Sequence, residues 1–327
     1  MPAKWGAQRI KGVSVSKALQ HALKQVVSKK KGISQNNTET SLIEKFLYPK
    51  FGPGQMWNEV ARIVKEKGGE ILINSKATEI VLEQNRIKNI IITNVLNNKQ
   101  TTLIGNYFFS TMPVKELINS LKPKPPKSIV EVANNLQYRD FITVGLLLKN
   151  LKIKQSPKNK NGNNLIKDNW IYIQEKSVKI GRLQVFNNWS PHLVKNPDNV
   201  WLGLEYFCNE GDDLWQKNDK DFIKFAIDEL TSINIIEKEA VLDATIIKMP
   251  KTYPAYFGSY NRFDEIKNYT NTIENLFLVG RNGMHKYNNQ DHSMLTAMTA
   301  VENIKNNIIS KNNIWAINTE QDYHEEA

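Results

Sequence analysis

The chain has 327 residues, of which 40% are hydrophobic and 24% are charged. This composition is typical of a soluble globular protein with one large domain or two ordinary ones, and it argues against a disordered chain. No run of about 18 apolar residues occurs, so the sequence predicts no transmembrane helix. The first twenty residues lack the continuous apolar stretch of a signal peptide.

Lysine and arginine outnumber aspartate and glutamate by 44 to 33, which gives a net charge of +11. Because lysine is frequent along the whole chain, we assign most of this charge to an ordinary surface. A basic patch for nucleic acid or a membrane is the less favoured alternative, and part of the charge could line a site for an anionic ligand. The single cysteine, Cys208, cannot form an internal disulfide, which favours a reducing, cytoplasmic compartment.

The first half of the chain alternates helices and strands. Helical spacing over residues 14–28 predicts an amphipathic helix within a helical N-terminal part, 1–45. A second helix is expected to begin at Pro53 and to end at Gly68-Gly69, where glycine favours a left-handed cap. Strands are expected at 70–74, at 78–83 and 88–93 around a tight turn at Asn85, and at 106–110, before a helix that ends at 121.

The prolines of "KPKPPKS" at 122–128 mark a change in composition and favour an extended connection. The segment that follows is rich in strand patterns separated by turn signals, and it predicts an antiparallel sheet with a helix packed on it. The strands are expected at 141–149, 169–174, 180–187, 200–208 and 240–250, the helix at 212–231, and an exposed loop at 158–164.

Three junctions in the sequence join a strand or loop to a helix through small residues. In "LVGRNG" an apolar strand ends at Gly280-Arg281, and a helix begins near Asp291 or His292. Backbone N–H groups at a helix start favour anionic or electron-rich ligand atoms. Taken alone, this motif fits an ordinary strand–loop–helix capped by Asp291 equally well. The other junctions lie at Gly52-Pro53-Gly54 and at Thr111-Met112-Pro113, and local pattern does not decide whether the three lie together.

Familiar catalytic motifs are absent from the sequence. It contains no C-x-x-C, H-E-x-x-H, G-x-S-x-G or Walker motif. His285 and His292 are close enough in sequence to share a metal, but the intervening loop offers only Asp291 as a carboxylate. We therefore expect no metal site and place these histidines at the surface or along a ligand site.

Three segments carry a resemblance to a known superfamily. "FLYPKFGPGQMWNEVARIVKEKGGEILINSKATEI" resembles the middle segment of the FAD-dependent oxidoreductases that include amine oxidases, protoporphyrinogen oxidase, phytoene desaturases and UDP-galactopyranose mutase. "YFFSTMPV" is similar to their strand that ends in Ser/Ala-Thr-x-Pro, and "NLFLVGRNGMHKYNNQDHSMLTAM" to their C-terminal FAD motif. The form G-R-x-G-x-x-x-Y is closest to the mutase-like branch.

The resemblance implies an α/β protein with α+β character. Residues 1–121 with 275–310 would form an incomplete FAD/NAD(P)-binding, Rossmann-like domain. Residues 122–274 would form a substrate domain with a mainly antiparallel sheet, and 311–327 a flexible tail.

The resemblance also implies FAD as the cofactor. The flavin side would be lined by Gly280, Arg281, Asp291, His292 and Met294, and the adenosine side by Ala77, Thr78, Thr111 and Pro113, with Gly52 and Gly54 as the nearest candidates for a phosphate turn. Arg281, Tyr287 and His285 would face the substrate.

One departure from the superfamily is large. Its members begin with a strand, a G-x-G-x-x-G turn and a helix, and no such element occurs here. We therefore expect the chain to correspond to the C-terminal two-thirds of a member and to have a separate chain carrying G-x-G-x-x-G as a possible partner. Three functions stay open: an oxidoreductase that transfers hydride from a small molecule to the flavin, a mutase-like enzyme acting on a nucleotide sugar, and a non-catalytic remnant or subunit of a split flavoenzyme.

Overall fold

The computed structural model describes residues 47–153 and 165–317. The helix expected at 14–28 and the loop expected at 158–164 lie outside the described residues. Two compact units are present. Of the described residues, unit 1 contains 47–67, 145–153, 165–204 and 226–244, and unit 2 contains 68–144, 205–225 and 245–317.

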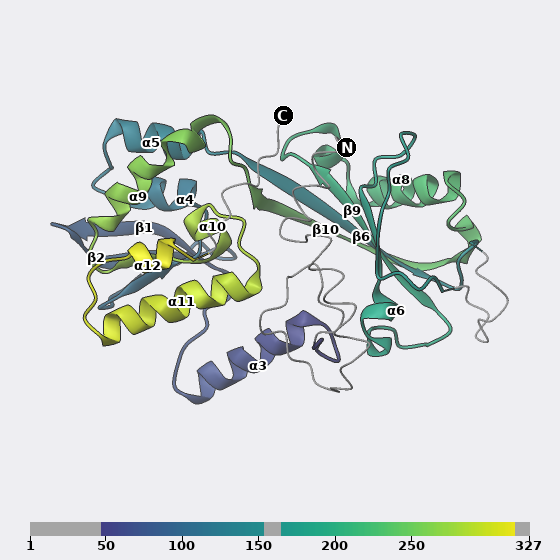
Figure 1. Cartoon of the computed structure of the whole chain (residues 1–327), viewed down its shortest axis with the longest axis horizontal. Coiled ribbons are helices and arrows are strands. Elements are labelled where there is room, and N and C mark those ends of the chain that lie inside the picture. Colours follow the sequence, from purple (N-terminus) through teal and green to yellow (C-terminus); the bar gives the residue numbers. More distant parts are fainter. Residues whose placement is uncertain (1–46, 154–164, 318–327) are drawn as a thin grey trace, which may run out of the picture. The chain divides into compact units, whose positions relative to one another are not determined.

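Unit 2 contains a four-stranded sheet in the order β3-β2-β1-β5. Its two central strands, β1 and β2, are labelled in Figure 1. Strands β1 (Ser75–Glu83) and β2 (Arg86–Asn94) form the antiparallel hairpin expected from the sequence, with Gln84 at a φ of 57° in the turn. β3 (Gln100–Leu103) pairs antiparallel with β2, and β5 (Leu121–Lys122) pairs parallel with β1. The strand expected at 70–74 is absent, and Ile73 of this apolar run is 76% exposed.

A second, two-stranded sheet of unit 2 joins segments that are far apart in sequence. β4 (Phe108–Ser110) and β11 (Leu276–Leu278) pair in parallel, with Phe277 opposite Phe109. A buried apolar cluster unites both sheets with the surrounding helices. These helices are α4 (Val114–Ser120), α5 (Lys127–Asn134), α9 (Phe263–Asn271), α10 (Gly280–Met284), α11 (Gln290–Lys305) and α12 (Asn312–Trp315).

A five-stranded sheet follows the order β10-β6-β9-β8-β7. Its strands are β6 (Tyr138–Leu148), β7 (Trp170–Tyr172), β8 (Arg182–Val185), β9 (Val200–Cys208) and β10 (Val241–Pro254). β6, β9 and β10 each run from one unit into the other along the chain. The two units therefore do not coincide with the expected domain boundaries at 121 and 274, and the division into FAD-binding and substrate domains stays a prediction.

The remaining helices lie around this sheet or precede the hairpin. α3 (Pro53–Glu66) begins at the expected proline, ends before Gly68 at a φ of 84°, and has no buried residue. The others are α6 (Phe186–Trp189), α7 (Asp213–Gln216), α8 (Asp219–Ser232) and three short 3-10 turns at Pro191–Leu193, Lys238–Ala240 and Gly258–Arg262. No described helix combines the length and the apolar character needed to cross a bilayer.

Three sequence expectations need correction. The helix expected at 212–231 is divided into α7 and α8, and Asn218 caps the second of them, because its Oδ1 accepts from Asp221 N over 3.0 Å. The extended connection at 122–128 gives way to α5 directly after Pro126. The tail expected from residue 311 instead begins with α12, whose Ile314 and Trp315 are buried, while 318–327 lie outside the described residues.

Candidate functional site

The end of β4 and the start of α10 are in close backbone contact. Val279 N donates to Ser110 O over 3.0 Å, and a Cβ added to Gly283 would lie 2.3 Å from the same oxygen. No residue with a side chain fits at position 283 without moving the backbone. Glycine at this position therefore allows α10 to pack directly on the strand end.

Gly280 connects this contact to α11. Its φ is 75°, a conformation that favours glycine, and its N–H donates to Thr296 Oγ1 over 3.0 Å. A Cβ at Gly280 would lie 3.8 Å from Ser293 Cβ and 4.0 Å from Thr111 Cγ2. Two of the three junctions seen in the sequence, at Thr111 and at Gly280, therefore lie side by side in unit 2.

The start of α11 is occupied by a capping box. The Asn289 side chain accepts from the backbone N–H of His292, and His292 Nδ1 accepts from Asn289 N over 3.3 Å. His292 therefore has a structural role in the helix cap, which the sequence had not predicted. Asp291 is exposed beside it, and Met294 is 38% exposed.

Two buried oxygens at the junction lack hydrogen-bond partners among the described residues. They are Ser110 Oγ, at the end of β4, and Asn282 Oδ1, next to Gly283 in α10. An unsatisfied buried polar atom costs about 1–3 kcal/mol, so a ligand or another segment that supplied partners here would stabilise the protein. Neither residue was predicted, although Ser110 precedes the Thr-x-Pro of the strand end and Asn282 lies inside the Gly-x-x-Gly of "GRNG".

Arg281 lies against two stacked tyrosines. The Tyr253 and Tyr287 rings have centroids 5.6 Å apart at an interplanar angle of 14°, and the guanidinium carbon is 5.5 Å and 4.7 Å from their centroids. Arg281 Nε donates to Asn288 O and Nη1 to Thr252 O. No carboxylate of the described residues forms an ion pair with this guanidinium, so its charge is balanced only by dipoles and ring faces.

His285 is fully buried, in contrast to its expected position against a substrate. It adopts a left-handed conformation at a φ of 48°, and its Nε2 lies 3.1 Å from Ala255 O. The Tyr138 ring packs edge-on against it with centroids 4.8 Å apart, and Tyr260 and Phe263 lie nearby. This burial lowers the pKa of His285 to about 4, which keeps the imidazole neutral at physiological pH.

Of the residues expected on the adenosine side, Ala77 and Thr78 lie in β1, and Thr111 and Pro113 lie between β4 and α4. Thr78 lies at a register irregularity between Ala77 and Glu79, and its hydroxyl contacts Thr93 Oγ1 at 2.9 Å and Ile91 O at 3.2 Å. Pro113 is the N-cap residue of α4, whose apolar face shares the buried cluster with β1. Core packing therefore brings the two elements together.

Gly52 and Gly54 belong to unit 1. Gly52 has a φ of 84°, and a Cβ there would lie 3.4 Å from Leu193 Cδ2. Its turn is held by Ser190 Oγ, which donates to Lys50 O over 2.7 Å. Gly54, in the first turn of α3, has no heavy atom within 4 Å of an added Cβ. The assignment of all these residues to cofactor or substrate stays a prediction.

No protein-family model matches the sequence, and no curated protein matches it. Among solved structures, the chain is similar to a reduced UDP-galactopyranose mutase, with a TM-score of 0.64, 19% identity, and coverage of 86% of this chain and 57% of that one. It is also similar to a candidate protoporphyrinogen oxidase from Exiguobacterium sp. 255-15, with a TM-score of 0.57, 13% identity, and coverage of 84% and 55%. The chain thus spans little more than half the length of these structures. Its fold is the one that they share, and both the expected fold class and the predicted likeness to this group of proteins are confirmed at the level of the fold.

Proposed function

We propose that this chain forms the flavin-side half of an FAD site in an oxidoreductase-type enzyme. The observation that carries the proposal is the junction of β4, α10 and α11. There Gly283 packs on Ser110, and the buried oxygens Ser110 Oγ and Asn282 Oδ1 have no hydrogen-bond partner among the described residues. The likeness in fold to a mutase and an oxidase structure supports the same assignment.

The chemistry of the junction fits one part of FAD better than another. Ser110 Oγ and Asn282 Oδ1 can both accept hydrogen bonds, so they suit ribityl hydroxyls or an N–H of the flavin ring. The N–H of Gly280 already donates to Thr296, and Asp291 is a carboxylate, so this junction is poorly suited to a phosphate. A bound flavin would supply hydride acceptance, while the chain would orient it and exclude water.

A mutase-like reaction on a nucleotide sugar is the second candidate, and Arg281 favours it. Its guanidinium has no carboxylate partner among the described residues and lies against the Tyr253–Tyr287 pair. Arginine is well suited to bidentate contact with phosphate, and tyrosine faces can pack on a base or a sugar. The substrate class would then be an anionic nucleoside-diphosphate sugar.

Fluorescence titration of FAD into the full chain tests the proposal. Wild type is expected to quench flavin emission saturably. Asn282→Leu is expected to weaken FAD binding about tenfold, because it removes one hydrogen bond between uncharged groups. Asn97→Ala, in an exposed turn of β2–β3, is the control and should bind as wild type does. Equal affinity for Asn282→Leu and wild type would place the flavin elsewhere. Absence of binding by all variants would favour the non-catalytic alternative.

Binding of UDP-glucose to the wild-type chain and to Arg281→Met tests the second candidate, the mutase-like function. Arg281→Met should weaken its binding at least tenfold and leave FAD affinity within about threefold of wild type, if the guanidinium contacts the diphosphate. Loss of FAD affinity with unchanged sugar-nucleotide binding would assign Arg281 to the flavin instead.

A further inference from the structure

Lys251 has a backbone conformation that is unusual for a lysine in a strand. Its φ is 56°, in the left-handed region, although it lies within β10. Seven described non-glycine residues have a positive φ; five are asparagine or glutamine, and the other two are Lys251 and His285. Non-glycine residues in this region are uncommon and cluster at functional sites. Such a residue also turns a strand locally, as at a β-bulge, and redirects the side chains that follow it.

Asp140 holds this conformation from the neighbouring strand. It lies in β6, which is placed between β10 and β9 in the sheet, and it is 4% exposed. Its Oδ1 accepts from Lys251 N over 2.6 Å, and its Oδ2 accepts from Glu210 N, just after β9. Because a buried carboxylate needs such donors, the Lys251 amide is tied to the position of Asp140.

Two further contacts fix the backbone around Lys251. The Thr252 hydroxyl donates to Met249 O over 2.9 Å, which closes the chain across Lys251. The Lys251 ammonium lies 3.2 Å from Glu116 Oε1, in the first turn of α4, and 3.8 Å from Glu210 Oε2. Two carboxylates therefore balance this charge, so the backbone of Lys251, rather than its ammonium, is the feature that remains to be explained.

The Lys251 turn, residues 249–252, leads directly into the groups that hold Arg281. Thr252 O accepts from Arg281 Nη1 over 3.1 Å, and the centroid of the Tyr253 ring lies 5.5 Å from the guanidinium carbon. Arg281 Nε donates to Asn288 O over 2.8 Å. No described residue accepts a hydrogen bond from Nη2. This edge of the guanidinium is therefore left for a ligand.

A second left-handed residue fixes the other segment of the Arg281 site. His285, at a φ of 48°, follows α10, and its Nε2 lies 3.1 Å from Ala255 O. The Tyr287 N–H donates to Tyr256 OH. Segments 252–256 and 285–288 are therefore joined around the guanidinium, and each of them follows or contains a residue in a conformation that favours glycine.

We propose that Asp140 is a positioning residue for the Arg281 site. It acts through the Lys251 turn, which places the Thr252 carbonyl and the Tyr253 ring and thereby aims the guanidinium at an anionic group of the ligand. An arginine held in this way loses little freedom when it binds. That the ligand is a nucleoside-diphosphate sugar rests on the proposed function; the effect of Asp140 on the orientation of Arg281 does not.

Two substitutions at Lys251 separate the backbone conformation from the side-chain charge. Both remove the ammonium, but Lys251→Gly tolerates a positive φ, whereas the β-branched side chain of Lys251→Val strongly disfavours it. Titration calorimetry with UDP-glucose should give an affinity at least tenfold lower for Lys251→Val than for Lys251→Gly. Ile247→Ala, at an exposed position of the same strand, is the control and should bind within threefold of wild type.

Asp140→Ala tests the anchor itself. It removes both acceptors, so UDP-glucose affinity should fall at least tenfold, while FAD affinity stays within about threefold of wild type. Asp140→Asn keeps one oxygen that can accept from Lys251 N, and it should bind UDP-glucose at least threefold more tightly than Asp140→Ala. Equal losses of FAD and UDP-glucose affinity would mean that Asp140 serves stability alone. Should Asp140→Ala fail to fold, the two Lys251 variants decide.

NMR of the chain with isotope-labelled arginine gives a readout that needs no ligand. The Arg281 Nε–H signal, identified by its loss in Arg281→Met, should exchange with solvent at least fivefold faster in Lys251→Val than in Lys251→Gly, because the guanidinium loses the Thr252 carbonyl. Equal exchange in the two variants would overturn the proposal. The predicted difference in exchange, in a chain that binds no UDP-glucose, would support the role of the Lys251 turn and contradict only the nucleotide-sugar function.

Discussion

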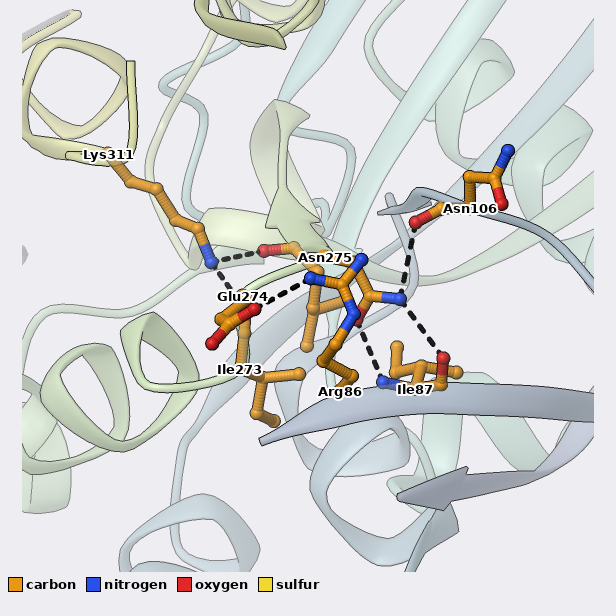
Figure 2. Close-up of polar contacts among 8 residues, drawn as sticks. Arg86, Ile87, Asn106, Ile273, Glu274, Asn275 and Lys311 are labelled. Atoms are coloured by element: carbon orange, nitrogen blue, oxygen red, sulfur yellow. Dashed lines mark hydrogen bonds and ion pairs between the residues drawn. The ribbon is translucent and has the colours of Figure 1, made fainter. Parts of the chain in front are cut away.

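Asn275 and Ile87 lie 188 residues apart in the sequence, yet the side chain of Asn275 pairs with both backbone polar groups of Ile87 (Figure 2). Asn275 Oδ1 accepts from Ile87 N over 2.8 Å, and Nδ2 donates to Ile87 O over 3.0 Å. The amide is 2% exposed and also donates to Asn106 O over 3.3 Å. One side chain therefore joins the β1–β2 hairpin, the start of β4 and the start of β11.

Asn275→Ala is expected to destabilise the protein strongly. It would leave the N–H and C=O of Ile87 buried without partners, which costs about 2–4 kcal/mol in the free energy of unfolding. The neighbouring Arg86–Glu274 ion pair provides the control, since both side chains are more than half exposed. Arg86→Gln should cost less than about 1 kcal/mol. Urea denaturation measures the free energy of unfolding of the two variants. A similar loss of stability in both would contradict the role given to Asn275.

Gly283→Ala should disrupt the junction of β4 and α10. The added Cβ would lie 2.3 Å from Ser110 O, a backbone atom that cannot move aside cheaply, so we expect a loss of about 3 kcal/mol or more. Gly54→Ala is the matched control, because the new Cβ would meet no atom within 4 Å and alanine favours helix. Its stability should equal or slightly exceed that of wild type in thermal denaturation. A harmless Gly283→Ala would show that α10 is not held against the strand.

Ser110→Ala separates stability from ligand binding. Because Ser110 Oγ is buried without a described partner, its removal should raise the stability of the free chain by up to about 1 kcal/mol. The same change should weaken FAD binding, since the hydroxyl is one of the proposed flavin contacts. Calorimetry of the free chain and a flavin titration test the two effects. A destabilised variant would mean that the hydroxyl already has a partner in the free protein.

Stability should fall in mild acid because of His285. Burial lowers its pKa to about 4, while the unfolded chain keeps a value near 6.5. The unfolded state therefore binds a proton at a higher pH than the folded state, and stability is lost as the pH falls from about 6.5 through 4. The loss should amount to about 3 kcal/mol. His285→Asn, which tolerates the left-handed backbone, should flatten this part of the pH profile.

Local pattern was sufficient to predict some elements of the fold. The β1–β2 hairpin follows from alternation around Asn85, and α3 from Pro53 and Gly68, because each signal lies within the element itself. The apolar run at 70–74 has the same kind of signal but forms no strand, and no strand of the described residues pairs with it. Burial and strand pairing, rather than intrinsic strand propensity, determined the secondary structure of residues 70–74.

The site was less accessible to prediction from the sequence. The Gly-rich turn at Gly280 was visible, but the contact that fixes it is with Ser110, far away in the chain. The family resemblance placed His285 toward a substrate, yet the rings of Tyr138 and Phe263 pack against it. Contacts between distant segments depend on topology, and a single sequence carries no local signal for them.

The most direct test of the account is the visible spectrum of the purified full chain after incubation with FAD and gel filtration. We predict that the protein fraction of the wild type carries the flavin absorption band and that the fraction of Asn282→Leu retains less flavin, because Asn282 Oδ1 is one of the proposed flavin contacts. A colourless protein fraction from a wild-type chain that is folded by circular dichroism would contradict the assignment of this chain to a flavin site.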